Sequence, residues 1–392
     1  MTGVGMGGEG VSVPSLMAEA EATAGTDDWG DLSFLAAADL LLESCRSTGQ
    51  LNDLGWRVLP KVFLRHLLNR LYLQAHLRRH PAAAEAPLRA AVVVTGLPRT
   101  GTTVLHNLLA QDPAHRVLRL WQALHPVPAA ADGPFSEPAL VGQARSWLEK
   151  LYEMTPAFRA IHPATPDGPE ECDALFQNAF ASHHFDDMFD AQDYSSWLHE
   201  ASLEREYGYY ALQLRVLAGA DDGPAAPWAL KSPSHLAHLP ALLATLPDAV
   251  VVHCHRHVLE AVPSYASLVR AVRSPYRDHL DPAALGRQAL ERCSTIMAKA
   301  LAARDAAGPD HFVDVSYDTL VADPIAAVGQ VYDRLGRPLG GAAEGAMRRW
   351  VEENPQHRHG VHRYRLEEFG LDGPGVLAAL STYLERFPAL MG

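Results

Sequence analysis

Two hydrophobic periods alternate along this chain of 392 residues. Short runs of consecutive apolar residues predict buried strands, and longer segments with an apolar residue every three or four positions predict helices. The strands are expected at 92–94, 228–231, 249–254 and 312–317. Because helical patterns separate them, the order predicts an α/β fold in which helices flank a central parallel sheet on both faces. Ligands of such sheets bind at the carboxyl ends of the strands.

The same patterns divide the chain into regions. Residues 1–28 are rich in Gly, Ala and Glu, and we expect them to be disordered. Residues 29–88 are predicted to form a helical N-terminal segment that ends in an Ala- and Pro-rich linker at 81–87. Residues 89–392 are expected to form the sheet domain, into which a mostly helical cap is inserted at 140–225.

The cap sequence contains many aromatic residues. The simpler interpretation is that they form the core of the cap helices. The alternative is that the inner face of the cap binds an apolar or aromatic small molecule above the sheet. The residues concerned are Trp147, Tyr152, Phe158, Phe176, Phe180, Phe185, Phe189, Tyr194, Trp197, Tyr207, Tyr209 and Tyr210.

A glycine-containing loop follows the first predicted strand and leads into an amphipathic helix. Gly96 and Gly101, followed by two threonines, have the spacing of a nucleotide P-loop, so the sheet is predicted to be of the P-loop type. The Lys that normally follows the second Gly is absent, and Arg99 lies inside the loop instead. Backbone N–H groups around Arg99–Thr103, together with the helix N-terminus, can bind a phosphate. An ordinary turn needs neither the arginine nor the paired threonines.

Cationic side chains lie at or just after the ends of two later predicted strands. Lys231 closes the second predicted strand and Arg256 follows the third, where a kinase or NTPase would place an Asp for magnesium. A cation-lined site without a metal suits a sulfuryl group, which carries less charge than a phosphoryl group, because Lys and Arg can stabilise it directly.

The loop LPRTGTT at 97–103 resembles the 5′-phosphosulfate loop of sulfotransferases, which use 3′-phosphoadenosine-5′-phosphosulfate (PAPS). The resemblance continues in Arg256 and Ser264, whose spacing is that of the Arg and Ser that bind the nucleotide 3′-phosphate in this family; Ser267 lies one turn further on. It implies that the donor contacts come from Pro98, Arg99, Thr100, Gly101, Thr102, Thr103, Arg256 and Ser264.

Three further segments are similar to the family. Lys231 with His235 resembles its strand-end Lys and nearby His, which implies that Lys231 stabilises the transferring sulfuryl group and His235 takes the acceptor proton. Tyr317 resembles a Tyr near the adenosine. The segment 360–371 is similar to a C-terminal loop of one bacterial branch, which implies that His362 and Arg363 close over the 3′-phosphate.

One position departs from the family. Many members have a Trp-Glu pair after the P-loop helix, and that Glu is a candidate catalytic base, whereas this chain has Gln122 after Trp121. A glutamine cannot accept a proton at neutral pH. The candidate bases are therefore, in order of preference, His235, His125 and Glu171, and the pair His183-His184 is a further possibility.

Composition narrows the class of protein further. Apolar residues make up 48% of the chain, and the net charge of −13 argues against general binding to nucleic acid or to an anionic membrane. No apolar run approaches the roughly 20 residues of a membrane span, and the N-terminus lacks the features of a secretory signal. The four cysteines form no CxxC pair and are read as reduced thiols of a cytoplasmic protein.

A metal site is not expected. His253, His255 and His257 alternate, so an extended strand would place them on one face. We expect no acidic partner close to them, and Cys254 would point away together with Arg256.

The resemblance implies transfer of a sulfuryl group from PAPS to a hydroxyl, phenol or amine of a small apolar or aromatic acceptor, with adenosine 3′,5′-bisphosphate as the second product. Gln122 leaves open a homologue that binds the nucleotide without transferring sulfate. A small-molecule kinase is the third possibility, and the missing P-loop Lys argues against it.

Overall fold

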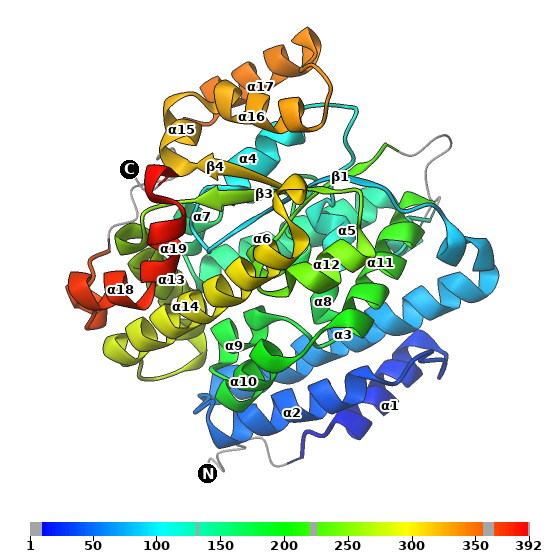
Figure 1. Ribbon diagram of the computed structural model, residues 1–392. Coiled ribbons are helices and arrows are strands. Elements are labelled where there is room, and N and C mark those ends of the chain that lie inside the picture. Colours follow the sequence, from blue (N-terminus) through cyan, green and yellow to red (C-terminus); the bar gives the residue numbers. More distant parts are fainter. Residues whose placement is uncertain (1–9, 131–132, 220–225, 356–363, 391–392) are drawn as a thin grey trace.

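The computed structural model describes residues 10–130, 133–219, 226–355 and 364–390. Its centre is a four-stranded parallel sheet in the order β2-β1-β3-β4 (Figure 1). The strands are β1 (Ala90–Gly96), β2 (Trp228–Lys231), β3 (Val250–His255) and β4 (Phe312–Ser316). The predicted α/β fold is therefore confirmed, and the expected strand bounds differ from the observed ones by no more than two residues.

The strand register brings the predicted polar residues to one edge of the sheet. Val94 lies opposite Lys231, and Gly96 lies opposite Cys254. His255 in turn lies opposite Ser316 on β4. The loop after β1 and the first residues after β2, β3 and β4 consequently start at the same carboxyl edge, which is where parallel sheets bind ligands.

Alternate side chains of the strands pack into two separate cores. Val92 and Val94 of β1 are buried against the helices α4 (Thr102–Leu109), α16 (Pro324–Arg334) and α17 (Gly341–Glu353). Val93 points to the opposite face, which is covered by α12 (Leu239–Thr245), α13 (Val258–Arg273) and α14 (Pro282–Ala307) (Figure 1). This alternation follows from the two-residue period of a strand, and burial on both faces explains why β1 is apolar from Ala90 to Val94.

The N-terminal region is more ordered than expected. The prediction that residues 1–28 are disordered is wrong for α1 (Val13–Ala24), and residues 1–9 lie outside the described part. Ser12 and Ser15 form a capping box at the start of α1, and Leu16 and Ala20 are buried in the main core. The helix packs against α3 (Asp53–Arg79) and also contacts α2 (Phe34–Ser47). Its apolar stripe is thus buried by a partner distant in the sequence.

A set of mostly short helices occupies the region between β1 and β2. They are α5 (Leu120–Leu124), α6 (Glu137–Met154), α7 (Phe158–Ile161), α8 (Asp173–Gln177), α9 (His183–Phe189), α10 (Gln192–Glu200) and α11 (Glu204–Ala218). The remaining helices are α15 (Tyr317–Ala322), α18 (Gly373–Ala379) and α19 (Ser381–Arg386).

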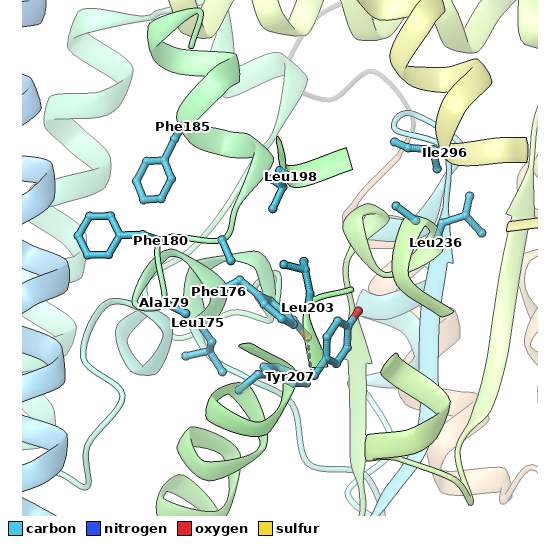
Figure 2. Close-up of a cluster of buried hydrophobic side chains, with 14 of the residues drawn as sticks. Leu175, Phe176, Ala179, Phe180, Phe185, Leu198, Leu203, Tyr207, Leu236 and Ile296 are labelled. Atoms are coloured by element: carbon cyan, nitrogen blue, oxygen red, sulfur yellow. Dashed lines mark hydrogen bonds between the residues drawn. The ribbon is translucent and has the colours of Figure 1, made fainter. Parts of the chain in front are cut away.

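Most aromatic residues of this region belong to its core. Phe180, Phe185 and Tyr207 are buried in one cluster, which Figure 2 shows together with Phe176. Phe180 and Phe185 stack with their ring centroids 5.9 Å apart. The interpretation of the aromatic pattern as helix core therefore holds for these residues.

All four cysteines carry free, buried thiols. Among the described residues, no helix combines the length and the apolar character that crossing a bilayer requires.

Candidate active site

Two glycines shape the loop that follows β1, because neither position has room for a side chain. A Cβ on Gly96 would lie 2.5 Å from the carbonyl oxygen of Cys254 on the neighbouring strand. Gly101 has a φ of +91°, and a Cβ there would lie 3.0 Å from the ring of Tyr317. Gly101 precedes α4, whose N-terminus receives no side-chain cap. The loop therefore presents helical N–H groups to the carboxyl edge of the sheet, as an anion site requires.

Arg99 adopts a left-handed backbone conformation, with a φ of 73°. Strain of this kind in a non-glycine residue is typical of functional loops. Its guanidinium donates hydrogen bonds to the carbonyl oxygen of Ile161 at 2.7 Å and to Ser264 Oγ at 3.3 Å. Burial lowers the pKa of Arg99, and the charge of Arg256 lowers it further. Two cations thus lie close enough to repel each other, an arrangement that a bound anion would stabilise.

Arg256 lies directly beside the loop. Its Nη1 donates to the carbonyl oxygen of Arg99 at 3.0 Å, and its guanidinium carbon lies 4.2 Å from the centroid of the Tyr317 ring. Glu260 and the Tyr364 hydroxyl accept its remaining hydrogen bonds. The residues predicted for the two ends of the donor are therefore in contact, although 157 positions separate Arg99 from Arg256.

The two serines of α13 are both buried, but they have different partners. Ser264 accepts from Arg99, whereas Ser267 accepts from Arg270 at 3.5 Å. Thr100, the first of the three threonines in the loop, donates its hydroxyl to the carbonyl oxygen of Leu97 and so stabilises the turn.

Lys231 extends from the end of β2 to the start of α4. The side chain is buried, and its Nζ donates to Thr103 Oγ1 at 3.4 Å and to Glu171 Oε1 at 2.5 Å. The backbone carbonyl of Lys231 accepts from the N–H of Cys172, which fixes the segment that carries Glu171. The loop, the strand-end lysine and one of the candidate bases thus form a single cluster.

Two of the histidines among the candidate bases, His183 and His235, are buried. His235 is completely buried, and its Nδ1 lies 2.8 Å from the Tyr207 hydroxyl. Burial lowers the pKa of His235 to about 3. His125 is partly buried, which lowers its pKa to about 4, and His183 is buried with neither ring nitrogen hydrogen-bonded. Glu171 alone among the candidates contacts Lys231.

Gln122 has a structural partner. Its side-chain oxygen accepts from the backbone N–H of Arg119 at 3.1 Å and so caps the short helix α5. The position therefore serves the helix whether or not it takes part in chemistry.

Sequence reasoning missed a pair beside this cluster. His162 Nε2 lies 3.4 Å from Glu170 Oε1, and Ile161, the residue before His162, is the one that accepts from Arg99. Glu170 stands next to Glu171 in the sequence, which was the only signal available. Nothing local indicates that a histidine after α7 meets that carboxylate.

The three alternating histidines do not share a face. His257 lies beyond β3, where its ring caps α13, so only His253 and His255 point to the α14 side. The expectation that they have no acidic neighbour is wrong, because Asp314 on β4 lies 2.8 Å from His255 Nε2. These three residues could in principle hold a metal ion. The Arg304 guanidinium takes the place that a metal ion would need, since it donates to both oxygens of Asp314 and lies 2.9 Å from His253 Nδ1.

Two predicted donor contacts, His362 and Arg363, lie outside the described residues. Tyr364, which follows them, reaches Arg256.

Fold and site together define an α/β protein with a central parallel sheet, flanked by helices, and a cluster of cationic side chains at its carboxyl edge. The family model described as "Sulfotransferase family" matches residues 91–340, and the chain belongs to this family. No curated protein matches it significantly.

Two solved structures resemble the chain over nearly its whole length. Sulfotransferase STF1 from Mycobacterium tuberculosis is 28% identical with a TM-score of 0.81, and the match covers 95% of this chain and 99% of that one. Sulfotransferase STF9 from Mycobacterium avium is 29% identical with a TM-score of 0.84, over 99% of this chain and 98% of that one.

Proposed function

We propose that this protein transfers a sulfuryl group from PAPS to a hydroxyl, phenol or amine of a small, apolar or aromatic acceptor. The observation that carries the proposal is the contact between Arg99 and Arg256, which joins the glycine loop to the end of β3. A donor with an anion at each end of an adenosine fits two adjacent guanidinium groups and the free N–H groups of α4.

The donor residues divide into two groups. Arg99, Thr102 and Thr103 are proposed to bind the phosphosulfate, with Pro98, Thr100 and Gly101 shaping the loop. Arg256 and Ser264 are proposed to bind the 3′-phosphate, assisted by His362 and Arg363, while Tyr317 packs against the adenosine. The stacking of Arg256 on Tyr317 supports a shared role for these two side chains.

Lys231 is proposed to stabilise the charge on the transferring sulfuryl group. The acceptor oxygen or nitrogen attacks sulfur, the bond from sulfur to the 5′-phosphate oxygen breaks, and adenosine 3′,5′-bisphosphate leaves with the electron pair. Positioning and cation stabilisation supply most of the rate. Glu171 holds Lys231 before the donor arrives, and this contact makes it the best placed of His235, His125 and Glu171 to accept a proton.

The test has two parts. Calorimetry with adenosine 3′,5′-bisphosphate measures donor-site binding, and mass spectrometry of PAPS incubated with phenols, alcohols and amines measures transfer. Both binding and a mass gain of one sulfuryl group are expected. Binding without transfer to any acceptor would favour the impaired homologue, which Gln122 had suggested. Magnesium-dependent ATP binding without bisphosphate binding would instead favour a kinase.

The four free, buried thiols support a cytoplasmic location for this reaction.

A further inference from the structure

We propose that His162 is the general base that takes the acceptor proton, and that Glu170 is the residue that positions it. This inference rests on the proposed function, because it names a catalytic residue for that same transfer. It also answers the question that Gln122 raises, because His235 is completely buried and the Glu171 carboxylate, although accessible, is engaged by the Lys231 ammonium.

The position of His162 in the fold places it beside the donor site. It directly follows α7, and the carbonyl oxygen of the preceding Ile161 accepts from the Arg99 guanidinium at 2.7 Å. On its other side, Glu170 is close enough to Lys231 to interact with its charge. The residue before His162 therefore contacts the loop cation, and the carboxylate partner of His162 interacts with the strand-end cation. Both cations are proposed to contact the phosphosulfate.

Glu170 determines which nitrogen of His162 is available. Its Oε1 lies 3.4 Å from His162 Nε2 and also accepts from the backbone N–H of Glu171 at 2.8 Å. Burial alone would raise the pKa of Glu170, but His162, Lys231 and this N–H lower it to about 2. An ionised carboxylate only accepts hydrogen bonds, so Nε2 carries the hydrogen and Nδ1 keeps its lone pair. A carboxylate that orients an imidazole in this way is the arrangement used in many catalytic sites.

Further contacts hold the imidazole ring. The ring of Phe158 stacks on it, with centroids 5.6 Å apart and an angle of 28° between the planes. The Tyr152 hydroxyl donates to the carbonyl oxygen of His162 at 3.3 Å and accepts from the N–H of Ala164. The His162 side chain is nevertheless 20% exposed, whereas His235 is completely buried. A held ring with access from outside is what proton transfer to a bound acceptor requires.

The charges around His162 come from several elements. The α13 helix packs against α7, and its Glu260 and Arg270 are paired with Arg256 and Glu368 respectively. Arg159 on α7 stacks over Tyr152 of α6. The charged and titratable groups around the pair therefore include Arg99, His106, Tyr152, Arg159, Glu171 and Lys231.

In the proposed step, the proton of the acceptor hydroxyl passes to His162 Nδ1 as the acceptor oxygen forms its bond to sulfur. The bond from sulfur to the 5′-phosphate oxygen breaks, and the bisphosphate leaves with that electron pair. Glu170 stabilises the imidazolium until its proton returns to solvent.

The first experiment compares His162→Gln, Glu170→Gln and the control His80→Gln, which removes an exposed imidazole at the end of α3. General base catalysis contributes about 10²–10⁴-fold, so His162→Gln should lose about 100-fold or more in kcat. Bisphosphate affinity and melting temperature should stay close to those of the wild type, as they should in His80→Gln. The acid limb of the pH–rate profile should vanish in His162→Gln and move to lower pH in Glu170→Gln, because the imidazolium loses its anion. Added imidazole should restore part of the activity of His162→Ala.

The second experiment does not depend on turnover. A ¹⁵N NMR spectrum of the His162 ring, with the bisphosphate bound, should show the hydrogen on Nε2 in the wild type and a mixture of both tautomers in Glu170→Gln. The same tautomer in both proteins would overturn the positioning role of Glu170.

Three results would overturn the catalytic role of His162: an unchanged pH profile in His162→Gln, parallel loss of kcat and bisphosphate affinity, or a wild type that binds the bisphosphate but transfers sulfate to no acceptor, water included. A wild type that does not bind the bisphosphate would instead refute the proposed function itself.

Discussion

Arg256 donates a hydrogen bond to the main-chain carbonyl of Arg99 over 3.0 Å. The contact joins the loop after β1 to the start of α13, and Arg99 returns it by donating to Ser264 on the same helix. Because the two guanidinium groups belong to one hydrogen-bond network, a substitution at either end of the donor site is expected to alter ligand binding at the other end.

Replacing Arg256 with alanine should weaken binding of adenosine 3′,5′-bisphosphate. Hydrogen bonds to charged groups contribute about 1.5–3 kcal/mol, which corresponds to about a 10- to 100-fold loss of affinity. Calorimetry measures the change, and Arg348→Ala on α17, which removes an exposed arginine paired with Glu344, is the matched control. Unchanged affinity in Arg256→Ala would show that the 3′-phosphate binds elsewhere.

Replacing Lys231 with methionine should lower turnover more than donor affinity. A cation that acts on the transition state contributes about 10²–10³-fold to kcat, whereas the ground-state complex needs it less. Steady-state kinetics and bisphosphate calorimetry separate the two effects. The substitution leaves Glu171 without its partner, so the double variant with Glu171→Gln tests whether that carboxylate alone causes the loss. Equal losses of kcat and affinity would contradict a transition-state role.

Two Gly→Ala substitutions should have opposite effects. At Gly101 the backbone has a φ of +91°, and a methyl group would lie 2.9 Å from Leu320 Cδ2, so Gly101→Ala should destabilise the fold. The expected cost is about 1–3 kcal/mol, together with weaker bisphosphate binding. At Gly329 within α16 nothing lies within 4 Å of the added methyl, so Gly329→Ala should stabilise the protein. Urea unfolding measures both, and the expected gain is about 0.5–1 kcal/mol. A stable, binding-competent Gly101→Ala variant would contradict the described loop.

Stability should fall as the solution becomes acidic, in part because of His235. Burial lowers the pKa of His235 in the folded protein to about 3, whereas an unfolded histidine titrates near 6.5. Between these values only the unfolded chain takes up the proton, so stability is fully present above about pH 6.5 and is lost as the pH falls.

The contribution of His235 can be isolated with the variant His235→Gln. Between pH 7 and pH 5 the wild type should lose about 2 kcal/mol more unfolding free energy than this variant, because all other titrating groups are shared. Urea unfolding at the two pH values gives the difference. Identical pH dependence in the two proteins would mean that His235 titrates normally.

Local patterns were enough to predict the sheet and the glycine loop. The β2 strand has the predicted bounds Trp228–Lys231, and the loop after β1 has the glycines that its close approach to Cys254 and Tyr317 requires. Both features depend on neighbouring residues and on backbone geometry, which the sequence expresses directly. The helix at Val13–Ala24 escaped prediction, since its short apolar stripe is stabilised by packing against α3.

The roles of the titratable side chains could not be predicted in the same way. His235 follows Lys231 at a suggestive spacing, yet Tyr207 and Phe176 enclose it. Asp314 reaches His255 only because β3 and β4 are paired. The sequence by itself determined where the strands lie along the chain, the loop and the cations at the strand ends, because these follow from local periodicity and chain direction. Only the tertiary structure decided which acids and bases are buried, paired or open to a substrate, because burial and charge pairing depend on contacts between segments that are distant in the chain.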